Sequence, residues 1–470
     1  MAEYLITGFS EVLSVLMSQY NDTHSPPFWP ASILSIIVGS TILVFARAAD
    51  LHGGYPWFMF GTAWLCIWTL VAGFAESVVL LNVCRAMQGL AIAAFTPSSF
   101  TLFGSIYPKG TRKNLALGIY SASAPLGFYA GICTSASLPK EQIAWYFWIP
   151  SILAFITLIV SYLSIPSDRH DRPSLDLKMD WTGAFTITAG LVLVAYALAA
   201  GADSQNHKQW ATPAILIPFC IGILCLAFAV YIEGWYASCP LLPFDFFRPR
   251  AVKPFAIACL FFYGCFGTWL FTTTSFLMNS YNTTGIKLAA WFTPLAAGGF
   301  FISVAGSTIL HIFPITIMLL LSGLAWIAAP LLLALSDPAA GYWACPFPSM
   351  LCGTLGIDMT FLISIIFLSS VQPLKYQGLV GAVASILVNL GISFSLALSQ
   401  IAGEAASAHD MTDTNQRSME KANRARFWFA VGSAGVGFVI CAVFVRISRA
   451  VLDDEKEGQP PAHGVALESV

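Results

Sequence analysis

The sequence predicts an all-α protein that crosses a membrane many times. Of its 470 residues, 57% are hydrophobic and only 10% are charged, whereas soluble domains have about 25% charged residues. The mean hydropathy of +0.74 agrees with this composition. The apolar runs are long enough for helices to cross about 30 Å of hydrocarbon, and they lack the period-2 alternation of barrel strands. Because only helices and closed barrels satisfy the backbone inside a bilayer, these runs are expected to be helices.

We expect fourteen membrane spans, arranged as two bundles of six helices with two linker spans between them. The division follows from the number of spans and from the long break at 233–253, because many membrane proteins consist of two related bundles. The first span is short and contains Glu11. The expected spans are 4–18, 28–47, 57–80, 83–105, 115–136, 144–165, 181–201, 212–232, 254–278, 288–309, 313–335, 342–370, 378–403 and 427–447.

These spans define four expected regions. An N-terminal six-helix bundle occupies 1–165, and two linker spans with cytoplasmic loops occupy 166–253. A C-terminal six-helix bundle follows in 254–447, and a short cytoplasmic tail in 448–470.

The distribution of basic residues predicts that both termini are cytoplasmic. With this orientation, the breaks on the inner side carry about two-thirds of the 22 Lys and Arg residues. Two Asn-x-Thr sequons, at Asn21 and Asn282, then lie on the outer side. We therefore expect N-glycosylation at both positions and a multi-pass protein of the plasma membrane.

Several classes of function are excluded by what the sequence lacks. The net charge is −2 and no basic cluster is available to neutralise phosphates, so no nucleic-acid partner is expected. The 11 Cys residues lie mostly inside apolar runs, with no spacing typical of a metal site. No phosphate-binding loop or catalytic constellation occurs. We expect neither an enzyme nor a bound metal or cofactor.

Arg85 and Gln88 are the first candidates for a functional site inside the membrane. Within "NVCRAMQGLAIAAF" they are three residues apart, so they share one helix face. A charged residue in a span costs about 2.5–3.5 kcal/mol on insertion scales, which usually indicates a function. The pair is a candidate for the substrate or proton pathway. The alternative is that Arg85 extends to the outer headgroups from a position near the helix end.

Asp358 is the second candidate for the transport of a proton or a ligand. It lies near the middle of the apolar run "CGTLGIDMTFLISIIF". A lone carboxylate in such a place can bind and release a proton. The alternative is a structural hydrogen-bond partner for a neighbouring helix.

Two Gly-containing segments are predicted to position helices. In "GIYSASAPLGFYAG", Pro125 removes a backbone hydrogen bond, while Gly118 and Gly127 let another helix approach closely. In "RAADLHGGYP", Gly53 allows the chain to reverse between two spans, and Arg47 and Asp50 precede this turn. Tight packing and an ordinary charged loop are the respective alternatives.

These segments resemble the motifs of the major facilitator superfamily. "ARAADLHGG" resembles its signature after the second span, "RAMQG" its motif in the fourth span, and "SAPLGFYAG" its antiporter motif in the fifth. "DWTGAF" and "YQGLVGAVASILVNLGIS" are similar to segments of the fourteen-span drug:proton antiporter branch, in particular of fungal aminotriazole-resistance-like members. The resemblance extends over nearly the whole chain.

The resemblance implies a monomeric secondary transporter that exports a small organic compound in exchange for protons by alternating access. The compound would be a drug, toxin or secondary metabolite. Arg85, Gln88 and Asp358 would form the proton-coupling or substrate pathway. Arg47, Asp50 and Gly53 would form a cytoplasmic latch between the bundles, and Gly118, Pro125 and Gly127 the antiporter helix.

The sequence departs from the family pattern in the latch. Gly54 and Tyr55 replace its final basic pair, so a weaker latch is expected. Two other functions remain open: low-affinity transport of a small cation such as ammonium, and a receptor that binds without transport. The short acidic tail argues against the receptor, which normally has a long cytoplasmic extension.

Overall fold

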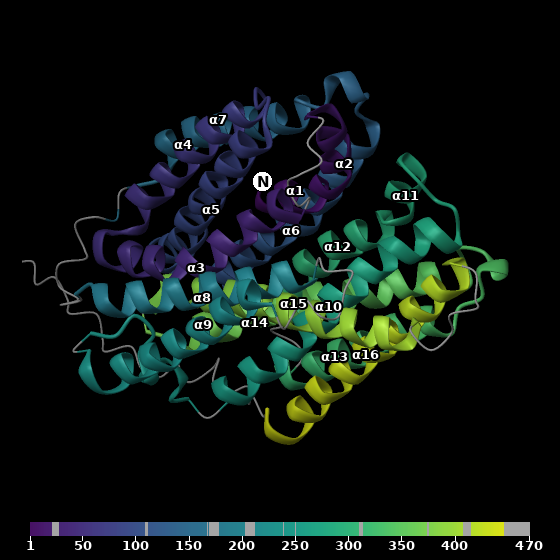
Figure 1. Ribbon diagram of the computed structural model, residues 1–470. Helices are drawn as coiled ribbons and strands as arrows, with labels where there is room; N and C mark the ends of the chain where they lie inside the picture. The colour runs from purple at the N-terminus through teal and green to yellow at the C-terminus, as the bar shows by residue number, and fades with distance from the viewer. Residues whose placement is uncertain are drawn as a thin grey trace, which may run out of the picture.

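The protein is described by a computed structural model in which every regular element among the described residues is a helix (Figure 1). The structure describes residues 1–20, 28–108, 111–166, 168, 178–202, 212–237, 239–249, 251–309, 314–373, 376–407 and 415–445. The predicted tail, 448–470, lies outside these residues.

Thirteen helices among the described residues are long and apolar enough to cross a membrane. Their lengths follow the apolar runs, because a helix satisfies its own backbone in lipid. The helices are α3 (Phe28–His52), α4 (Gly54–Ala72), α5 (Val78–Ile106), α6 (Thr111–Ser137), α7 (Trp145–Ser164), α8 (Trp181–Ala202), α9 (Pro213–Tyr231), α10 (Val252–Ser280), α11 with α12 (Ile286–Trp291 and Thr293–Ile309), α13 (Ile315–Ala334), α14 (Pro346–Val371), α15 (Gln377–Ser407) and α16 (Asn415–Phe444).

The first expected span differs from the prediction. Two short helices, α1 (Ala2–Thr7) and α2 (Phe9–Tyr20), replace one continuous helix, and neither meets the length of a spanning helix. They are separated at Gly8, where a Cβ would lie only 2.2 Å from the carbonyl oxygen of Gly131 in α6. The fourteen-span arrangement is therefore not confirmed by this count.

The last helix also begins earlier than expected. The sequence predicted a break over 404–426, but α16 starts at Asn415 and includes the basic residues of that segment. An ion pair of 2.9 Å joins Arg424 to Glu420, one helical turn apart. Arg426 also donates a hydrogen bond to the side chain of Gln400 on α15.

The helices form two packed groups (Figure 1). In the N-terminal half, α5 packs against α3 and α4, and α7 packs against α4. In the C-terminal half, α10 packs against α15 and α16, and α13 against α14 and α16. Helices α8 and α9 pack against each other, and α8 also contacts α3 and α15.

The two halves meet along two seams. Helix α6 packs against α12 and α14, while α3 and α5 pack against α15. A helix of one half therefore contacts the other half at each seam, and the residues on these helices are positioned to link the halves.

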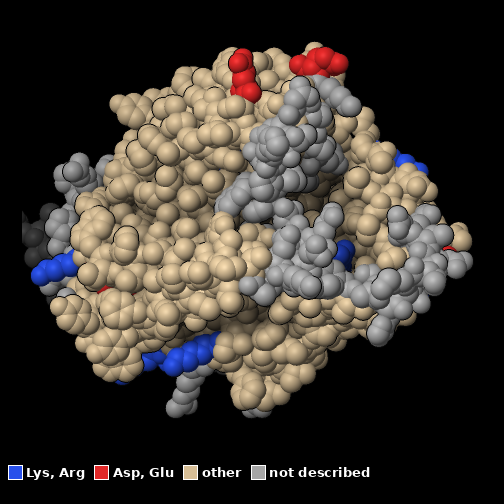
Figure 2. Space-filling model, in the orientation of Figure 1, with Lys and Arg blue, Asp and Glu red and all other residues tan. Residues whose placement is uncertain are grey.

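The outer surface is apolar, as lipid requires. Exposed aliphatic and aromatic side chains cover α7 and α9, including Phe155, Leu163, Leu224 and Phe228. Figure 2 shows one face on which few of the described side chains are charged. This surface and the spanning helices make the chain a multi-pass membrane protein.

Candidate functional site

Asp50 links the two halves at the end of α3. Its Oδ1 accepts hydrogen bonds from Thr101 Oγ1 at 3.2 Å and from the backbone N–H of Gly378 at 3.0 Å. Gly378 lies in the first turn of α15, where backbone amides lack helical partners and the helix dipole favours a carboxylate. The Asp50 side chain is buried, so this contact is held away from water. We call the end of the molecule that carries it the latch end.

The absence of a side chain at Gly378 permits this contact. A Cβ there would lie 2.6 Å from Thr101 Oγ1 and 2.8 Å from Asp50 Oδ1. The α15 backbone can approach α3 and α5 this closely only with glycine at the position.

Lys113 and Gln377 form a second link at the latch end that the sequence did not reveal. The buried Lys113 Nζ, on α6, donates to Gln377 Oε1 at 3.1 Å. Gln377 Nε2 donates to the carbonyl oxygens of Ser369 and Gln372, both at 3.1 Å. Gln377 thus joins α6 to α14 through its own side chain. No local pattern identifies these residues, because they are brought together by the packing of the two halves.

Arg47 contacts the linker helices rather than the opposite half. Its Nε donates to the carbonyl oxygen of Lys178 at 3.2 Å, and its Nη2 to that of Cys239 at 3.5 Å. Lys178 precedes α8, and Cys239 follows α9. Arg47 was predicted to join Asp50 in a latch. It attaches α3 to the segment before α8 and to the segment after α9.

Gly53 and Gly54 are required by the turn between α3 and α4. Gly53 has φ +94°, a conformation that favours glycine. Asp168, after α7, accepts from the backbone N–H of Gly54 at 2.9 Å and of Tyr55 at 3.1 Å. A Cβ on Gly54 would lie 2.6 Å from the carbonyl oxygen of Ser98. The position where the family motif has a basic residue therefore has no room for a side chain here.

Arg85 is buried and binds backbone carbonyl groups. Its Nε donates to Pro30 O at 3.0 Å, and its Nη1 to Leu5 O at 2.8 Å. Its Cζ also lies 3.8 Å from the centre of the Phe9 ring. Arg85 therefore points into the bundle and attaches α5 to α1, α2 and α3.

Gln88 shares the face of Arg85, as predicted. Its Oε1 accepts from Arg85 Nη1 at 3.5 Å. Within the described part of the chain, the buried Gln88 Nε2 has no hydrogen-bond partner. This amide group remains available for a ligand in the N-terminal half.

Pro125 and Asp358 meet where α6, α12 and α14 pack together. A Cβ on Gly299 of α12 would lie 2.6 Å from Asp358 Oδ2 and 2.7 Å from Pro125 Cβ. Gly299 therefore lets α6 approach the carboxylate on α14. This junction joins the two halves, and it brings together two residues that the sequence singled out separately.

Asp358 is 5% exposed, and its Oδ2 has no hydrogen-bond partner among the described residues. The glycines that flank it have a packing role. A Cβ on Gly353 would lie 2.5 Å from the ring of Trp269, and one on Gly356 would lie 2.7 Å from that of Trp326. Buried carboxylates are usually paired or hydrogen-bonded, so the unpartnered oxygen is available to a proton or a ligand.

Glu3, which lies just before the first expected span, also belongs to this centre. Its charge interacts with that of Asp358. Gly127 of α6 brings α1 close, since a Cβ there would lie 3.5 Å from Glu3 Cβ. The other glycine predicted to position this helix, Gly118, is buried within α6. Two carboxylates, one on α1 and one on α14, therefore lie close to α6.

Side-chain contacts continue along the seam between α6 and α12 beyond the carboxylates. Ser121 and Ser303 are joined by a hydrogen bond of 3.5 Å between their hydroxyl oxygens, and Tyr129 and Thr293 by one of 2.7 Å. The second contact lies toward the end of the molecule opposite the latch end, which we call the far end.

The far end also carries one predicted glycosylation site. Asn282 is exposed in the turn after α10 and has φ 49°. The other sequon asparagine, Asn21, lies outside the described residues. Nearby, Tyr342 donates to the Trp291 carbonyl oxygen at 2.8 Å. Burial raises the pKa of Tyr342 to about 12, so this donor stays protonated well above neutral pH.

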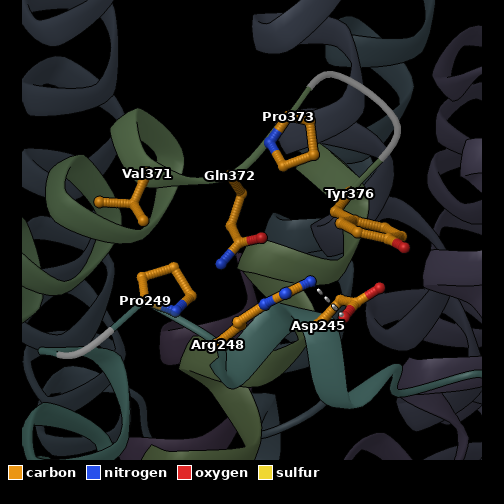
Figure 3. Close-up of a pocket in the computed structure, with 7 residues that line it drawn as sticks. All are labelled: Asp245, Arg248, Pro249, Val371, Gln372, Pro373 and Tyr376. Carbon is orange, nitrogen blue, oxygen red and sulfur yellow. Dashed lines mark ion pairs between the residues drawn. The ribbon is translucent and has the colours of Figure 1, made fainter. Parts of the chain in front are cut away.

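A pocket of about 390 Å³ opens at the latch end, but it contains none of the predicted site residues (Figure 3). Asp245 in the short helix η6 (Phe244–Phe247) pairs with Arg248 at 3.8 Å, and both side chains are largely exposed. The opposite wall comes from the connection between α14 and α15, including Gln372 and Tyr376. The described residues contain no group of three His, Cys, Asp or Glu side chains that could hold a metal ion.

Comparison with known proteins identifies relatives along most of the chain. The low affinity ammonium transporter of Saccharomyces cerevisiae is 31% identical over 88% of this chain and 80% of its own length. Efflux pump terJ of Aspergillus terreus is 31% identical over 93% and 84%, respectively. The aminotriazole resistance protein of S. cerevisiae is 26% identical over 92% and 79%.

Solved structures share the fold at low sequence identity. The proton:xylose symporter XylE matches with a TM-score of 0.63 at 9% identity, over 95% of this chain and 93% of that one. The human organic anion transporter MFSD10 matches with a TM-score of 0.62 at 12% identity, over 94% and 98%. The sequence also matches the Major Facilitator Superfamily over residues 4–396. The chain therefore belongs to the Major Facilitator Superfamily, with relatives in the fungal drug:proton antiporter branch, and it is a transporter rather than an enzyme.

Proposed function

We propose that this transporter exports a small organic compound in exchange for protons, and that Asp358 binds the proton or the compound in turn. The observation that carries this proposal is the position of Asp358. It is buried, its Oδ2 is unpartnered among the described residues, and it faces Pro125 of α6 across the junction of the two halves. A carboxylate in this position can respond to both a proton and a ligand.

The contacts at the two ends support alternating access. The latch end is held by Asp50 with Gly378 and by Lys113 with Gln377, and the α6–α12 seam by Tyr129 with Thr293. Each is a small set of hydrogen bonds, which breaks and reforms at modest cost. Opening one set while keeping the other would expose the Asp358 centre to one side of the membrane at a time.

Arg85 takes part by positioning α1. Its hydrogen bond to the Leu5 carbonyl oxygen attaches α5 to α1, the helix that carries Glu3, and its hydrogen bond to Pro30 attaches α5 to α3. In this proposal Arg85 and Gln88 influence proton coupling through the position of Glu3.

We also propose the direction of transport and the arrangement of the chain in the membrane. Efflux pump terJ and the aminotriazole resistance protein, by their names, support the export of an organic compound such as a drug or secondary metabolite. We further propose a monomer in the plasma membrane with both termini cytoplasmic and a glycan on Asn282. In this arrangement α1 and α2 form the first of fourteen spans, and the halves 1–165 and 254–447 flank the linker region 166–253.

Transport in inside-out vesicles tests the function. We expect a proton gradient, acidic inside, to drive accumulation of labelled aminotriazole, and the Asp358→Asn variant to lose at least ten-fold in rate. The matched control is Asp245→Asn, which removes an exposed carboxylate of the linker region and should leave the rate unchanged. Binding of the compound without proton-dependent accumulation would contradict the proposal.

A second candidate function is supported by the two carboxylates at the centre. Glu3 and Asp358 interact electrostatically, and two negative charges that interact in this way attract a small cation. The ammonium transporter of S. cerevisiae is a relative over most of the chain. Uptake of labelled methylammonium, lost in Asp358→Asn but insensitive to aminotriazole, would favour this function over export.

A further inference from the structure

A pair of acidic side chains lies where the linker helices meet, away from the Asp358 centre. Asp180 directly precedes α8, and Glu233 lies in the π-helical turn η5 (Ile232–Tyr236) at the end of α9. Helix α8 contacts η5, and π-helical turns occur often at functional positions. Neither residue belongs to the proposed transport pathway.

Each carboxylate has one oxygen with hydrogen-bond partners and one without. Asp180 Oδ1 accepts from Thr182 N at 3.1 Å, Thr182 Oγ1 at 2.6 Å and Gly183 N at 3.0 Å, so it caps α8. Glu233 Oε2 accepts from Leu242 N at 3.0 Å. Asp180 Oδ2 and Glu233 Oε1 are buried and, within the described residues, have no hydrogen-bond partner. Glu233 as a whole is 8% exposed.

The two unpartnered oxygens face the same space. A Cβ on Gly183 would lie 2.4 Å from Glu233 Oε1 and 2.5 Å from Asp180 Oδ2. The oxygens are therefore at most about 5 Å apart, a separation at which two negative charges strongly oppose each other's ionisation. Gly183 leaves room for this approach.

The charged groups around the pair do not neutralise it. From α3, Arg47 interacts electrostatically with Glu233, but its guanidinium donates to the carbonyl oxygens of Lys178 and Cys239. The other charged group near this end of α3, Asp50, binds Gly378 of α15. The Lys178 side chain is exposed. One arginine therefore faces two carboxylates, which leaves one negative charge in excess.

We propose that Asp180 and Glu233 hold one proton between them and form a second protonation site, separate from the transport pathway. A proton on either carboxyl donates from one unpartnered oxygen to the other, satisfies both oxygens and removes the excess charge. A Ca²⁺ ion fits less well, because it takes about 6–8 oxygen ligands and the pair offers two. The occupied site ties α8 to η5 beside Arg47, which attaches the linker pair to α3. Loss of the proton makes the carboxylates repel and loosens this attachment.

Melting of the purified full-length transporter at two pH values tests the proposal. We expect the wild-type Tm to fall by about 1–2 °C between about pH 6 and about pH 9. Glu233→Gln should match the wild type at the lower pH and keep its Tm at the higher pH, because its amide donates to Asp180 Oδ2 in place of the proton. Asp337→Asn, which changes an exposed cap of a short helix, should follow the wild type.

Infrared spectroscopy of the same proteins identifies the proton directly. A carboxylic C=O band that disappears on raising the pH should be present in the wild type and in Asp358→Asn, and absent in both Glu233→Gln and Asp180→Asn. The proposal is overturned if the Tm of Glu233→Gln falls in parallel with the wild type. It is also overturned if the band is unaffected by both substitutions, or if Ca²⁺ or Mg²⁺ stabilises the wild type and a chelator reverses this.

Discussion

At the scale of single residues, the polar groups of this transporter act mainly through the backbone of distant helices. Asp50 accepts from an amide of α15, Arg85 donates to carbonyls of α1 and α3, and Arg47 donates to carbonyls beside α8 and α9. Sequence reasoning placed all three in the bundle interior or at its end, because each interrupts or borders an apolar run. Their partners could not be predicted, since a backbone group has no residue type to recognise.

Substitution of Asp50 should weaken the latch end. Asp50→Ala leaves the Gly378 amide buried without its acceptor, which costs about 1–3 kcal/mol, and should lower the Tm and the transport rate. Asp50→Asn keeps an acceptor oxygen, so its Tm and its transport rate should fall less than those of Asp50→Ala. Tryptophan fluorescence on heating measures the difference.

The control for Asp50 is Asp337, a carboxylate that accepts a hydrogen bond from a backbone amide at an exposed position. Asp337 Oδ1 accepts from Ala339 N at 3.0 Å near the surface, where water can replace it. Equal losses for Asp337→Ala and Asp50→Ala would show that burial of the latch is unimportant.

At the scale of helices, the sequence predicted well which segments are helical. It predicted poorly where a helix is interrupted and which helices come into contact. Apolar length identified α3 to α15, because a helix in lipid must satisfy its backbone over its whole length. The interruption of the first helix at Gly8 arises from contact with Gly131 of α6, which is a tertiary effect. Glu3 was missed for a related reason: it precedes the apolar run, and only the packing of α1 on α6 brings it to Asp358.

The close approach of α12 to the centre should be sensitive to a single methyl group. Gly299→Ala places a Cβ where Asp358 Oδ2 and Pro125 Cβ would be 2.6 and 2.7 Å away. We expect about 1–3 kcal/mol of destabilisation from overpacking, together with loss of transport. Both the Tm and the vesicle assay report this change.

The control for Gly299→Ala is the same substitution at Gly432 on α16. A Cβ there meets no atom within 4 Å, and alanine is favoured over glycine inside a helix by about 0.5–1 kcal/mol. Gly432→Ala should therefore be neutral or stabilising. A tolerated Gly299→Ala would mean that the α6–α12–α14 junction is looser than its contacts indicate.

At the scale of the whole molecule, the two seams divide the contacts between the halves. The seam of α3 and α5 with α15 contains the Asp50 contact, and that of α6 with α12 contains the Ser121–Ser303 and Tyr129–Thr293 hydrogen bonds. The sequence identified the first through its turn motif. It could not identify the second, because Tyr129 and Thr293 belong to no pattern and meet only after the halves pack.

Weakening either seam should change the balance between conformations in opposite directions. A hydrogen bond is worth about 0.5–1.5 kcal/mol, so its loss changes a population ratio up to roughly ten-fold. Asp50→Ala should increase the population that is open at the latch end, and Tyr129→Phe the population that is open at the far end. Spin labels at positions 112 and 373 report the first, and labels at 137 and 286 the second, in a cysteine-free background. An identical response of both label pairs to both substitutions would exclude two independent seams.

The donor in the Asp50 contact is a main-chain amide, and this determines how the latch evolves. The N–H of Gly378 belongs to the main chain, so no exchange of side chains on α15 can compensate for a change at Asp50. Lys113 and Gln377 are in contact through their side chains. These two positions would therefore be expected to vary together among relatives. The Asp50 contact would leave no such record, and its counterpart on α15 would be visible only as a small residue at Gly378.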